Sequence, residues 1–343
     1  MIWWRYTFIA AVLMAAACDN DSDPVLTDGR GAVVFDAYDD GATVTTANIQ
    51  SFRVSAYTEP GHRLVMDNVT VRRTGLNSWR YTPEVMWPGG DTAVTFMAIT
   101  PPKYNITVNA HWHNTVNSVD SIGRSDICIA ARYSVRQNNG RIRLNFRHTL
   151  ARLIIMVRSS MPENHVYLKE LTLYNVCTGS TLYFPGETTA PDSGTLTACW
   201  PGYVDDMAHA KVPYFLSDSG EGIEIGNEAV DVSNTDNIFV IPFNPRPLEW
   251  HGYVSGTGFR LTCRICDSTG KQTWPDSSTN PQLIEASQGS RWGYIYFPIS
   301  PDSPNFRWNS GYTYRYTLDI ANEGTLPGQS SRSTSNTLTL EIQ

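Results

Sequence analysis

Apolar and polar side chains alternate, one residue after the next, along most of this chain. In the clearest stretch, 312–320, aromatic and aliphatic residues take every even position and polar residues every odd one. A period of two sends alternate side chains to opposite faces of a β-strand. After the first 17 residues, no window keeps the 3.6-residue period of an amphipathic helix. The sequence therefore predicts an all-β protein.

Further strands are predicted wherever alternating or β-branched runs lie between turn residues. They span 32–37, 51–57, 68–73, 79–82, 93–100, 127–133, 168–176, 238–243, 294–298 and 337–342. Turn signals such as Pro60-Gly61 and Asn139-Gly140 separate them at about 8 to 15 residues, the spacing typical of β-sandwich domains. Long, mainly polar segments at 185–196 and 276–290 are expected to be loops.

The length of 343 residues exceeds one average core and suits two domains of about 150 residues each. The junction is expected near His148, where the alternation changes phase. Residues 142–147 alternate, whereas 153–157 are apolar on both faces, as in a central strand. We therefore expect one sandwich at 31–148 and a second at 149–343, joined by one long strand or two consecutive strands. A boundary at 162–164 is the alternative.

The first eighteen residues, MIWWRYTFIAAVLMAAAC, are predicted to form a lipoprotein signal. Arg5 precedes an apolar run at 6–17 that is too short to span a bilayer as a permanent helix. Three alanines then lead into Cys18, so residues 1–17 would be removed and Cys18 acylated, which anchors the protein in the outer membrane. Ala15 stands where leucine is commonest. An ordinary cleaved signal with an incidental cysteine is the alternative.

Residues 18–30 are predicted to be an acidic tether. Positions 19–24 hold no apolar residue and cannot pack. In Gram-negative bacteria that export lipoproteins to the outer face, acidic residues after the lipidated cysteine resemble a surface-export signal. We therefore expect a lipid-anchored protein at the cell surface. A solvated spacer, compatible with either leaflet, is the alternative.

Charge and motifs argue against nucleic-acid binding and catalysis. The net charge of -7 disfavours a nucleic-acid partner, and the chain lacks a glycine-rich phosphate loop, a GxSxG elbow and an HExxH helix. His111 and His113 share a strand face, but nothing at ligand spacing completes a metal site. His148 is interpreted as a hydrogen-bonded structural histidine. We expect no catalytic residue, cofactor or metal, although a hydrolase cleft with paired carboxylates would escape sequence reasoning.

The cysteines are expected to be buried for the most part. Lipidation of Cys18 leaves five of the six, an odd number, and so at most two disulfides. Cys263 and Cys266 have CxxC spacing, which is used in redox and zinc sites. On a strand, however, this spacing points the two sulfurs to opposite faces, roughly 10 Å apart.

Several short motifs occur in a recognisable order. They are the cysteine at 18, the strand at 31–37, the threonine-rich approach to 51–57, Trp87-Pro88-Gly89, the stretch 144–151, and residues 308–314. Together they resemble the Mfa-like branch of the fimbrillin family over most of the mature chain. The resemblance implies two tandem transthyretin-like β-sandwich domains, of the Ig-like topology class. It also implies a pilus (fimbria) component, acting as anchor, tip or stalk, or an adhesin for a host or bacterial surface ligand.

The resemblance also implies how polymerising members assemble. A protease cuts after an arginine near the N-terminus and removes a first strand. The groove that this strand leaves open then accepts a strand from another pilus subunit. Arg30, between two glycines, matches such a cleavage site. The segment it would release, 19–30, holds only two apolar residues, Val25 and Leu26. This favours an uncut anchor or tip, and polymerisation by a different route is the alternative. Arg53 lies within a predicted strand and is expected to be shielded from proteases.

The last strand is a candidate donor to another subunit through Leu338, Leu340 and Ile342. An ordinary final strand is the preferred interpretation. Ser121, in Asp120-Ser121-Ile122, is the best match to a bacterial O-glycosylation sequon and lies in an expected loop.

The alternative function is a carbohydrate-binding surface lipoprotein of a polysaccharide-uptake system. Exposed tryptophans such as Trp112, Trp250 or Trp274 could stack on sugar rings. Packing in the core or at turns is the preferred interpretation for each. An exposed aromatic row on one sheet face would favour carbohydrate binding.

Overall fold

The computed structural model describes residues 31–39, 49–75, 78–109, 115–120, 125–137, 141–185, 200, 208–232, 238–246, 248–285, 291–299, 306–327 and 336–343. Regular structure within these residues is β-strand, apart from one 3-10 turn, η4 (Pro281–Leu283). The predicted all-β class is therefore confirmed. The described residues include no helix of the length and hydropathy needed to cross a membrane.

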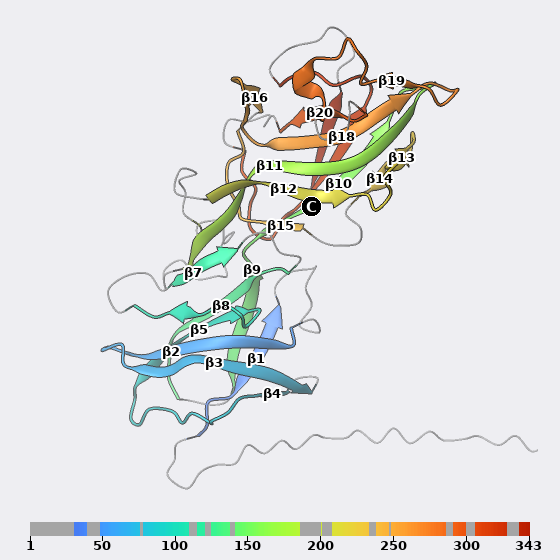
Figure 1. Cartoon of the computed structure of the whole chain (residues 1–343). Helices are drawn as coiled ribbons and strands as arrows, with labels where there is room; N and C mark the ends of the chain where they lie inside the picture. The colour runs from blue at the N-terminus through green and yellow to red at the C-terminus, as the bar shows by residue number, and fades with distance from the viewer. Residues whose placement is uncertain are drawn as a thin grey trace, which may run out of the picture.

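A sheet of seven strands forms the lower half of Figure 1. In spatial order it contains β1 (Phe35–Asp39), β9 (Ile142–His148), β8 (Cys128–Val135), β5 (Ala93–Thr100), β2 (Ser51–Glu59), β3 (Leu64–Gly75) and β4 (Ser78–Arg80). The pairing is antiparallel except between β1 and β9, which run parallel. The turn predicted at Pro60-Gly61 connects one of these antiparallel pairs, β2 and β3.

The upper half of Figure 1 holds two larger sheets and one small one. The first contains β14 (Val230–Asp231), β10 (Ala151–Ser159), β21 (Thr313–Ile320) and β22 (Thr337–Ile342), with β15 (Ile238–Val240) also on β10. The second contains β19 (Gln272–Trp274), β18 (Gly258–Cys266), β11 (His165–Tyr183), β7 (Thr115–Asp120) and β6 (Ile106–Thr107), with β12 (Ala208–Leu216) and β13 (Ile223–Ile225) on β11 and β20 (Gly293–Pro298) on β18. The small one pairs β16 (Glu249–Trp250) with β17 (Val254–Ser255).

The chain passes between the two halves as two consecutive strands, β9 and β10, separated by Thr149 and Leu150. β10 is central, as expected, because it pairs with β21 on one side and with β14 and β15 on the other. β7 comes from the first part of the sequence but pairs with the end of β11, at 179–183. Strand pairing therefore crosses the expected boundary at 148/149, and the division into two domains stays a prediction.

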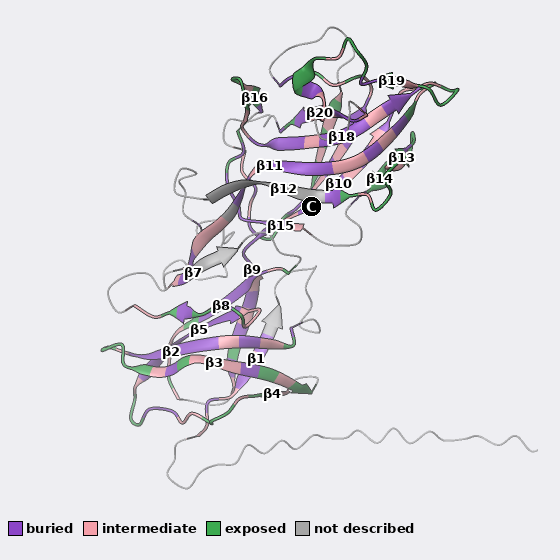
Figure 2. Cartoon of the chain, in the orientation of Figure 1, coloured by how far each residue is buried: buried purple, intermediate pink, exposed green. Residues whose placement is uncertain are grey.

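The strands of the seven-stranded sheet are rich in buried residues (Figure 2), and these residues belong to two apolar clusters, one on each face of the sheet. Phe52 and Phe96 face one apolar cluster, which we call the lower core and which includes Phe35 and Phe146. Met97, next to Phe96, points the other way into the upper core, which the sheets of the upper half also line. This explains why β5 is buried at seven of its eight positions.

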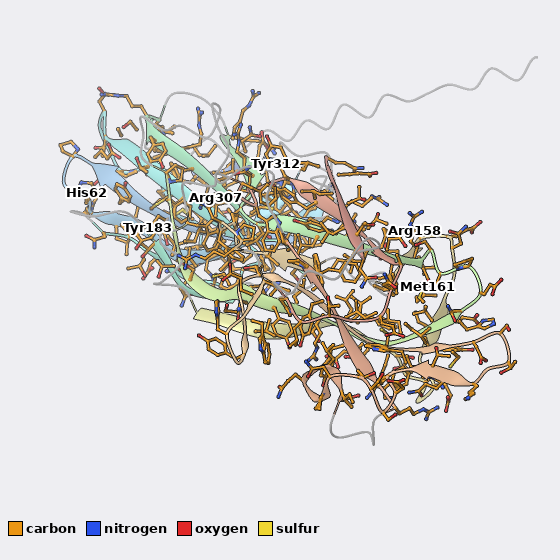
Figure 3. The ribbon with its side chains drawn as sticks, turned by 90° about the horizontal axis from the view of Figure 1, so that it is seen from above. His62, Arg158, Met161, Tyr183, Arg307 and Tyr312 are labelled. Atoms are coloured by element: carbon orange, nitrogen blue, oxygen red, sulfur yellow. The ribbon has the colours of Figure 1, made fainter. Side chains whose placement is uncertain are left out.

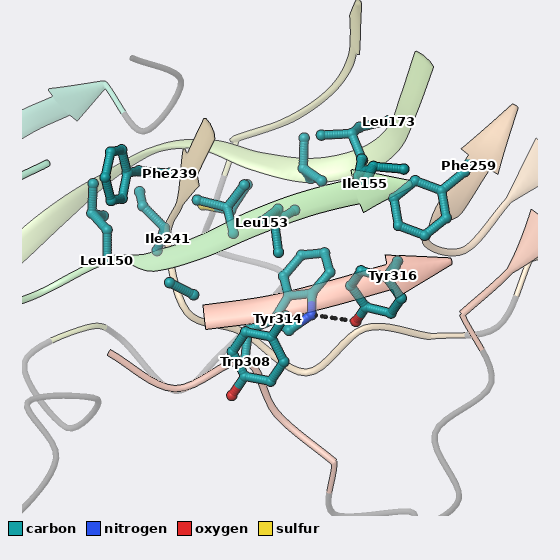
Figure 4. Packing of buried hydrophobic residues seen from close by; sticks show 14 of the residues in the cluster. Leu150, Leu153, Ile155, Leu173, Phe239, Ile241, Phe259, Trp308, Tyr314 and Tyr316 are labelled. Carbon is teal, nitrogen blue, oxygen red and sulfur yellow. Dashed lines mark hydrogen bonds between the residues drawn. The ribbon is translucent and has the colours of Figure 1, made fainter. Parts of the chain in front are cut away.

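The upper core packs aromatic rings between aliphatic strands (Figure 4). Trp308 Nε1 donates a hydrogen bond of 2.7 Å to the Tyr316 hydroxyl, which satisfies two buried polar groups at once. The rings of Tyr316 and Phe259 lie 5.0 Å apart, and Leu153 and Ile155 of β10 are fully buried beside them. Each such side chain contributes about 1.5–3 kcal/mol through burial.

The molecule is elongated when it is seen from above (Figure 3). His62, in the turn between β2 and β3, lies at one end of that view, and Arg158, near the end of β10, lies towards the other.

Candidate functional site

The last strand of the chain, β22, is at the outer edge of its sheet. It pairs antiparallel with β21 along six residues and ends the described strand order of that sheet. Leu338 and Leu340 are partly buried against the upper core, and Ile342 is 53% exposed. No residue of β22 is fully buried. An edge strand of this kind can be replaced by a strand from another chain, or can join another sheet itself.

Main-chain and cap hydrogen bonds hold the two ends of β22. Thr313 and Gln343 exchange two main-chain bonds of 2.9 Å. Asn336 Oδ1 accepts bonds of 2.9 Å from the amides of Ala321 and Asn322. Because β22 pairs with β21 through its main chain, an incoming strand could replace those hydrogen bonds one for one.

The first described strand, β1, is also outermost in its sheet, yet Phe35 and Ala37 of this strand belong to the lower core. Phe35 is 1% exposed. Its ring centroid lies 6.0 Å from that of Phe52, 5.8 Å from that of Tyr81 and 5.9 Å from that of Phe96. Ring pairs at these distances stabilise the fold by about 0.5–1.5 kcal/mol each beyond the area they bury. β1 is therefore anchored by side chains, in contrast to β22.

Hydrogen bonds from both sides fix the segment before β1. The Val33 amide donates to the Val85 carbonyl at 2.9 Å, and the Ile142 amide donates to the Val34 carbonyl at 2.6 Å. The Tyr81 hydroxyl, which follows β4, donates to the Val33 carbonyl at 2.7 Å. The two ends of the seven-stranded sheet thus meet around this segment. A cut upstream of residue 31 leaves all of these contacts in place.

Six of the tryptophans in the described part of the chain pack in the interior. Each is at most 7% exposed: Trp79, Trp87, Trp200, Trp274, Trp292 and Trp308. Of the three residues considered as sugar platforms, Trp274 is therefore a core residue, Trp250 is half-buried in β16, and Trp112 lies outside the described residues. The preferred interpretation, core packing, is confirmed for Trp274.

Tyrosines and arginines share one face of β11, β18 and β20. The Arg260 guanidinium lies 4.4 Å from the Tyr294 ring centroid and donates a 3.0 Å hydrogen bond to the Tyr174 hydroxyl. Arg264 lies 4.5 Å from the Tyr167 ring centroid. The guanidinium groups of these arginines lie over ring faces on which a sugar would stack. These cation–π contacts therefore stabilise the sheet itself.

Comparison with known families agrees with this all-β architecture. A family model described as fimbrillin-like matches residues 37–336. The chain belongs to the fimbrillin-like family. Membership supports a structural, cell-surface role in pili or in adhesion and confirms the resemblance seen in the sequence.

One solved structure shows the same fold. The fimbrillin-like chain is similar to a fimbrial protein from Bacteroides vulgatus ATCC 8482, with a TM-score of 0.59 and 15% identity over 92% of this chain and 99% of that one. A fimbrilin from Porphyromonas gingivalis W83 matches with a TM-score of 0.45 and 12% identity over 91% and 96% of the two chains. No curated protein matches the chain in sequence.

The residues proposed for processing and modification of this fimbrillin-like chain, Cys18, Arg30 and Ser121, lie outside the described residues, as do His111 and His113. Arg53 lies in β2, between β3 and β5, so the expectation that it is inside a strand is confirmed.

The described cysteines of the fimbrillin-like chain are buried and form no disulfide with one another: Cys128, Cys177, Cys263 and Cys266. Burial raises the pKa of the Cys177 thiol to about 11 and raises that of Cys263 well above its usual range. Both Cys263 and Cys266 lie in β18, as the predicted strand requires.

Sequence reasoning missed one side-chain cluster at the ends of β8 and β9. His148 Nδ1 is hydrogen-bonded to Asp126 Oδ2 and lies 3.5 Å from Cys128 Sγ. Burial raises the pKa of Asp126, and the hydrogen bond from His148 partly offsets this. The expectation that His148 is hydrogen-bonded is confirmed. Its partners are 20 and 22 residues away in sequence, so only the strand register reveals them.

Proposed function

We propose that this chain is a non-enzymatic, lipid-anchored surface protein that serves as a fimbria component or adhesin and assembles by exchange of β22 between subunits. The contrast between its two outermost strands supports this proposal. β22 pairs with β21 through its main chain and has no fully buried residue, whereas Phe35 and Ala37 of β1 are buried in the lower core. Strand addition needs a strand that can leave without dismantling a core, and β22 meets that requirement.

The difference between β1 and β22 also favours a chain that stays joined to its lipid anchor. Acylated Cys18 would hold the protein in the outer membrane through the acidic segment 18–30. A cut at Arg30 would release the lipid but leave β1 in place, so it would open no groove there. We therefore assign the uncut chain, with two tandem transthyretin-like domains at 31–148 and 149–343, to an anchor or tip position.

Lipid anchoring is tested by the variant Cys18→Ser. Loss of the protein from detergent-phase membrane extracts is expected, while the matched variant Cys266→Ser, which alters a buried thiol in β18, stays in the membrane phase. A Cys18→Ser protein that remains membrane-bound contradicts the anchor.

Loss of glycan mass in Ser121→Ala would support the proposed modification of Ser121.

Strand exchange is tested with a labelled peptide of residues 336–343 and a chain ending at 335. The peptide should bind this truncated chain, and binding should fail when Leu340 is replaced by Asp, because that side chain packs on the upper core. The matched peptide with Thr339→Asp should still bind, since Thr339 is exposed. A truncated chain that keeps native tryptophan fluorescence but binds no peptide contradicts the proposal.

A further inference from the structure

The cluster of Asp126, Cys128 and His148 owes its geometry to the strand register. Cys128, the first residue of β8, lies directly opposite His148, the last residue of β9. Side chains of directly opposed residues are close neighbours on one sheet face. Asp126 precedes Cys128 by two residues, and its Oδ2 is hydrogen-bonded to His148 Nδ1, so its side chain reaches the same place. Three different ligand types are thus brought to one point.

The three ligand atoms lie within 4.8 Å of one another: a carboxylate oxygen, a thiol sulfur and an imidazole nitrogen. The side chains of His148 and Asp126 are 7% and 9% exposed, and Cys128 is 2% exposed. A buried set of thiolate, imidazole and carboxylate binds Zn²⁺ in preference to Mg²⁺ or Ca²⁺. We infer that Asp126, Cys128 and His148 form a binding site for Zn²⁺ or a similar divalent transition-metal ion.

The separation of the ligand atoms fits one shared ion. With ordinary zinc–sulfur and zinc–nitrogen bonds, tetrahedral ligands lie about 3.6 Å apart, and Cys128 Sγ and His148 Nδ1 lie 3.5 Å apart. In the ion-free protein a hydrogen bond joins His148 to Asp126. Coordination displaces the proton these two side chains share and the proton of the Cys128 thiol, and the carboxylate moves outward to make room. Three protein ligands leave a fourth position for water.

The surroundings of the site set its strength and its effect. Arg152 adds a positive charge that interacts with Asp126, which weakens cation binding relative to three isolated ligands.

Thr149, next to His148, is hydrogen-bonded to three residues from other parts of the chain. Its carbonyl accepts bonds from Trp200 Nε1 at 2.6 Å and Ser310 Oγ at 2.8 Å, and its amide donates to Ile127 at 2.9 Å. An ion at this point would stiffen the passage from β9 to β10.

The test uses Co²⁺ as a spectroscopic probe on the purified full chain after treatment with a chelator. One equivalent should produce a thiolate-to-cobalt charge-transfer band and the visible bands of tetrahedral cobalt, and Zn²⁺ should bleach both. Cys128→Ser should abolish the charge-transfer band. Asp126→Asn, which keeps a hydrogen-bond acceptor for His148, should weaken cobalt binding at least about tenfold.

Cys266→Ser is the matched control, because Cys266 is another buried thiol but lies in β18, outside the cluster. It should leave the cobalt spectrum unchanged. The inference is overturned if wild-type protein shows no charge-transfer band at stoichiometric Co²⁺, or if the band survives in a folded Cys128→Ser variant. Should Cys128→Ser fail to fold, the spectrum of Asp126→Asn decides, because unaltered cobalt affinity there also overturns the site.

Discussion

Replacing Phe35 with alanine should remove much of the anchoring of β1. The side chain is 1% exposed and lies within 6.0 Å, between ring centroids, of Phe52, Tyr81 and Phe96. Deletion of a buried phenylalanine ring costs about 3–5 kcal/mol, because both the transfer free energy and the cavity contribute. The three surrounding rings cannot easily move in to fill the cavity that Phe35 leaves, so we expect a destabilisation in the upper half of that range.

Urea unfolding followed by tryptophan fluorescence measures this cost, since Trp79 and Trp87 belong to the same lower core as Phe35. The comparison variant is Leu340→Ala in β22. Leu340 is only partly buried, so we expect a loss of about 1 kcal/mol. Leu64→Ala controls for nonspecific effects, because Leu64 is 47% exposed and should change stability by less than about 0.5 kcal/mol.

The reasoning is refuted if Phe35→Ala costs no more than Leu340→Ala. Such a result would mean that β1 is not anchored by its side chains. Cleavage after Arg30 would then be the expected step that opens a groove for a strand from another subunit.

The cysteines, β22 and the upper core each provide a further check. Native Cys177 and Cys263 should react with a thiol reagent at least about tenfold more slowly than in denaturant, because burial raises both pKa values; equal rates would contradict this. Amide hydrogen exchange should be faster at 338–342 than at 33–37, and the reverse order would argue against a detachable β22. Trp308→Phe should cost about 1–3 kcal/mol in urea unfolding, because Tyr316 loses a buried donor; no change would show that this bond is unimportant.

Local sequence patterns were sufficient where a strand carries its own alternation and turn signals. β5 lies at the predicted residues 93–100, and β22 lies at 337–342, the stretch whose alternation predicts the final strand. β7 was missed, because Thr115–Asp120 has no apolar run and becomes a strand through pairing with the distant end of β11. β11 itself extends from 165 to 183, well beyond the predicted 168–176, since it pairs with β7 and β12 as well as β18.

The candidate sites show the same limit. Alternation identified Leu338 and Leu340 as one face of a final strand, but the outer position and partial burial of that strand depend on the sheet order. The opposition of Cys128 and His148 depends on the register between β8 and β9. Spacing along the sequence contains neither piece of information, because both arise from long-range pairing.

Exchange of β22 is tested most directly by cysteines placed across its pairing with β21. Arg315 and Glu341 are directly opposed, and both side chains are at least one-third exposed, at 35% and 63%. Opposed residues of antiparallel strands lie about 4.5–5.5 Å apart between Cα atoms, within the range a disulfide needs. In the double variant Arg315→Cys, Glu341→Cys, we expect monomers to form a disulfide within one chain. In fimbriae assembled on cells, β22 has left β21, so this disulfide should not form within the chain, and both introduced thiols should stay reactive towards a maleimide. Disulfides found only within single chains of assembled fimbriae would contradict strand exchange.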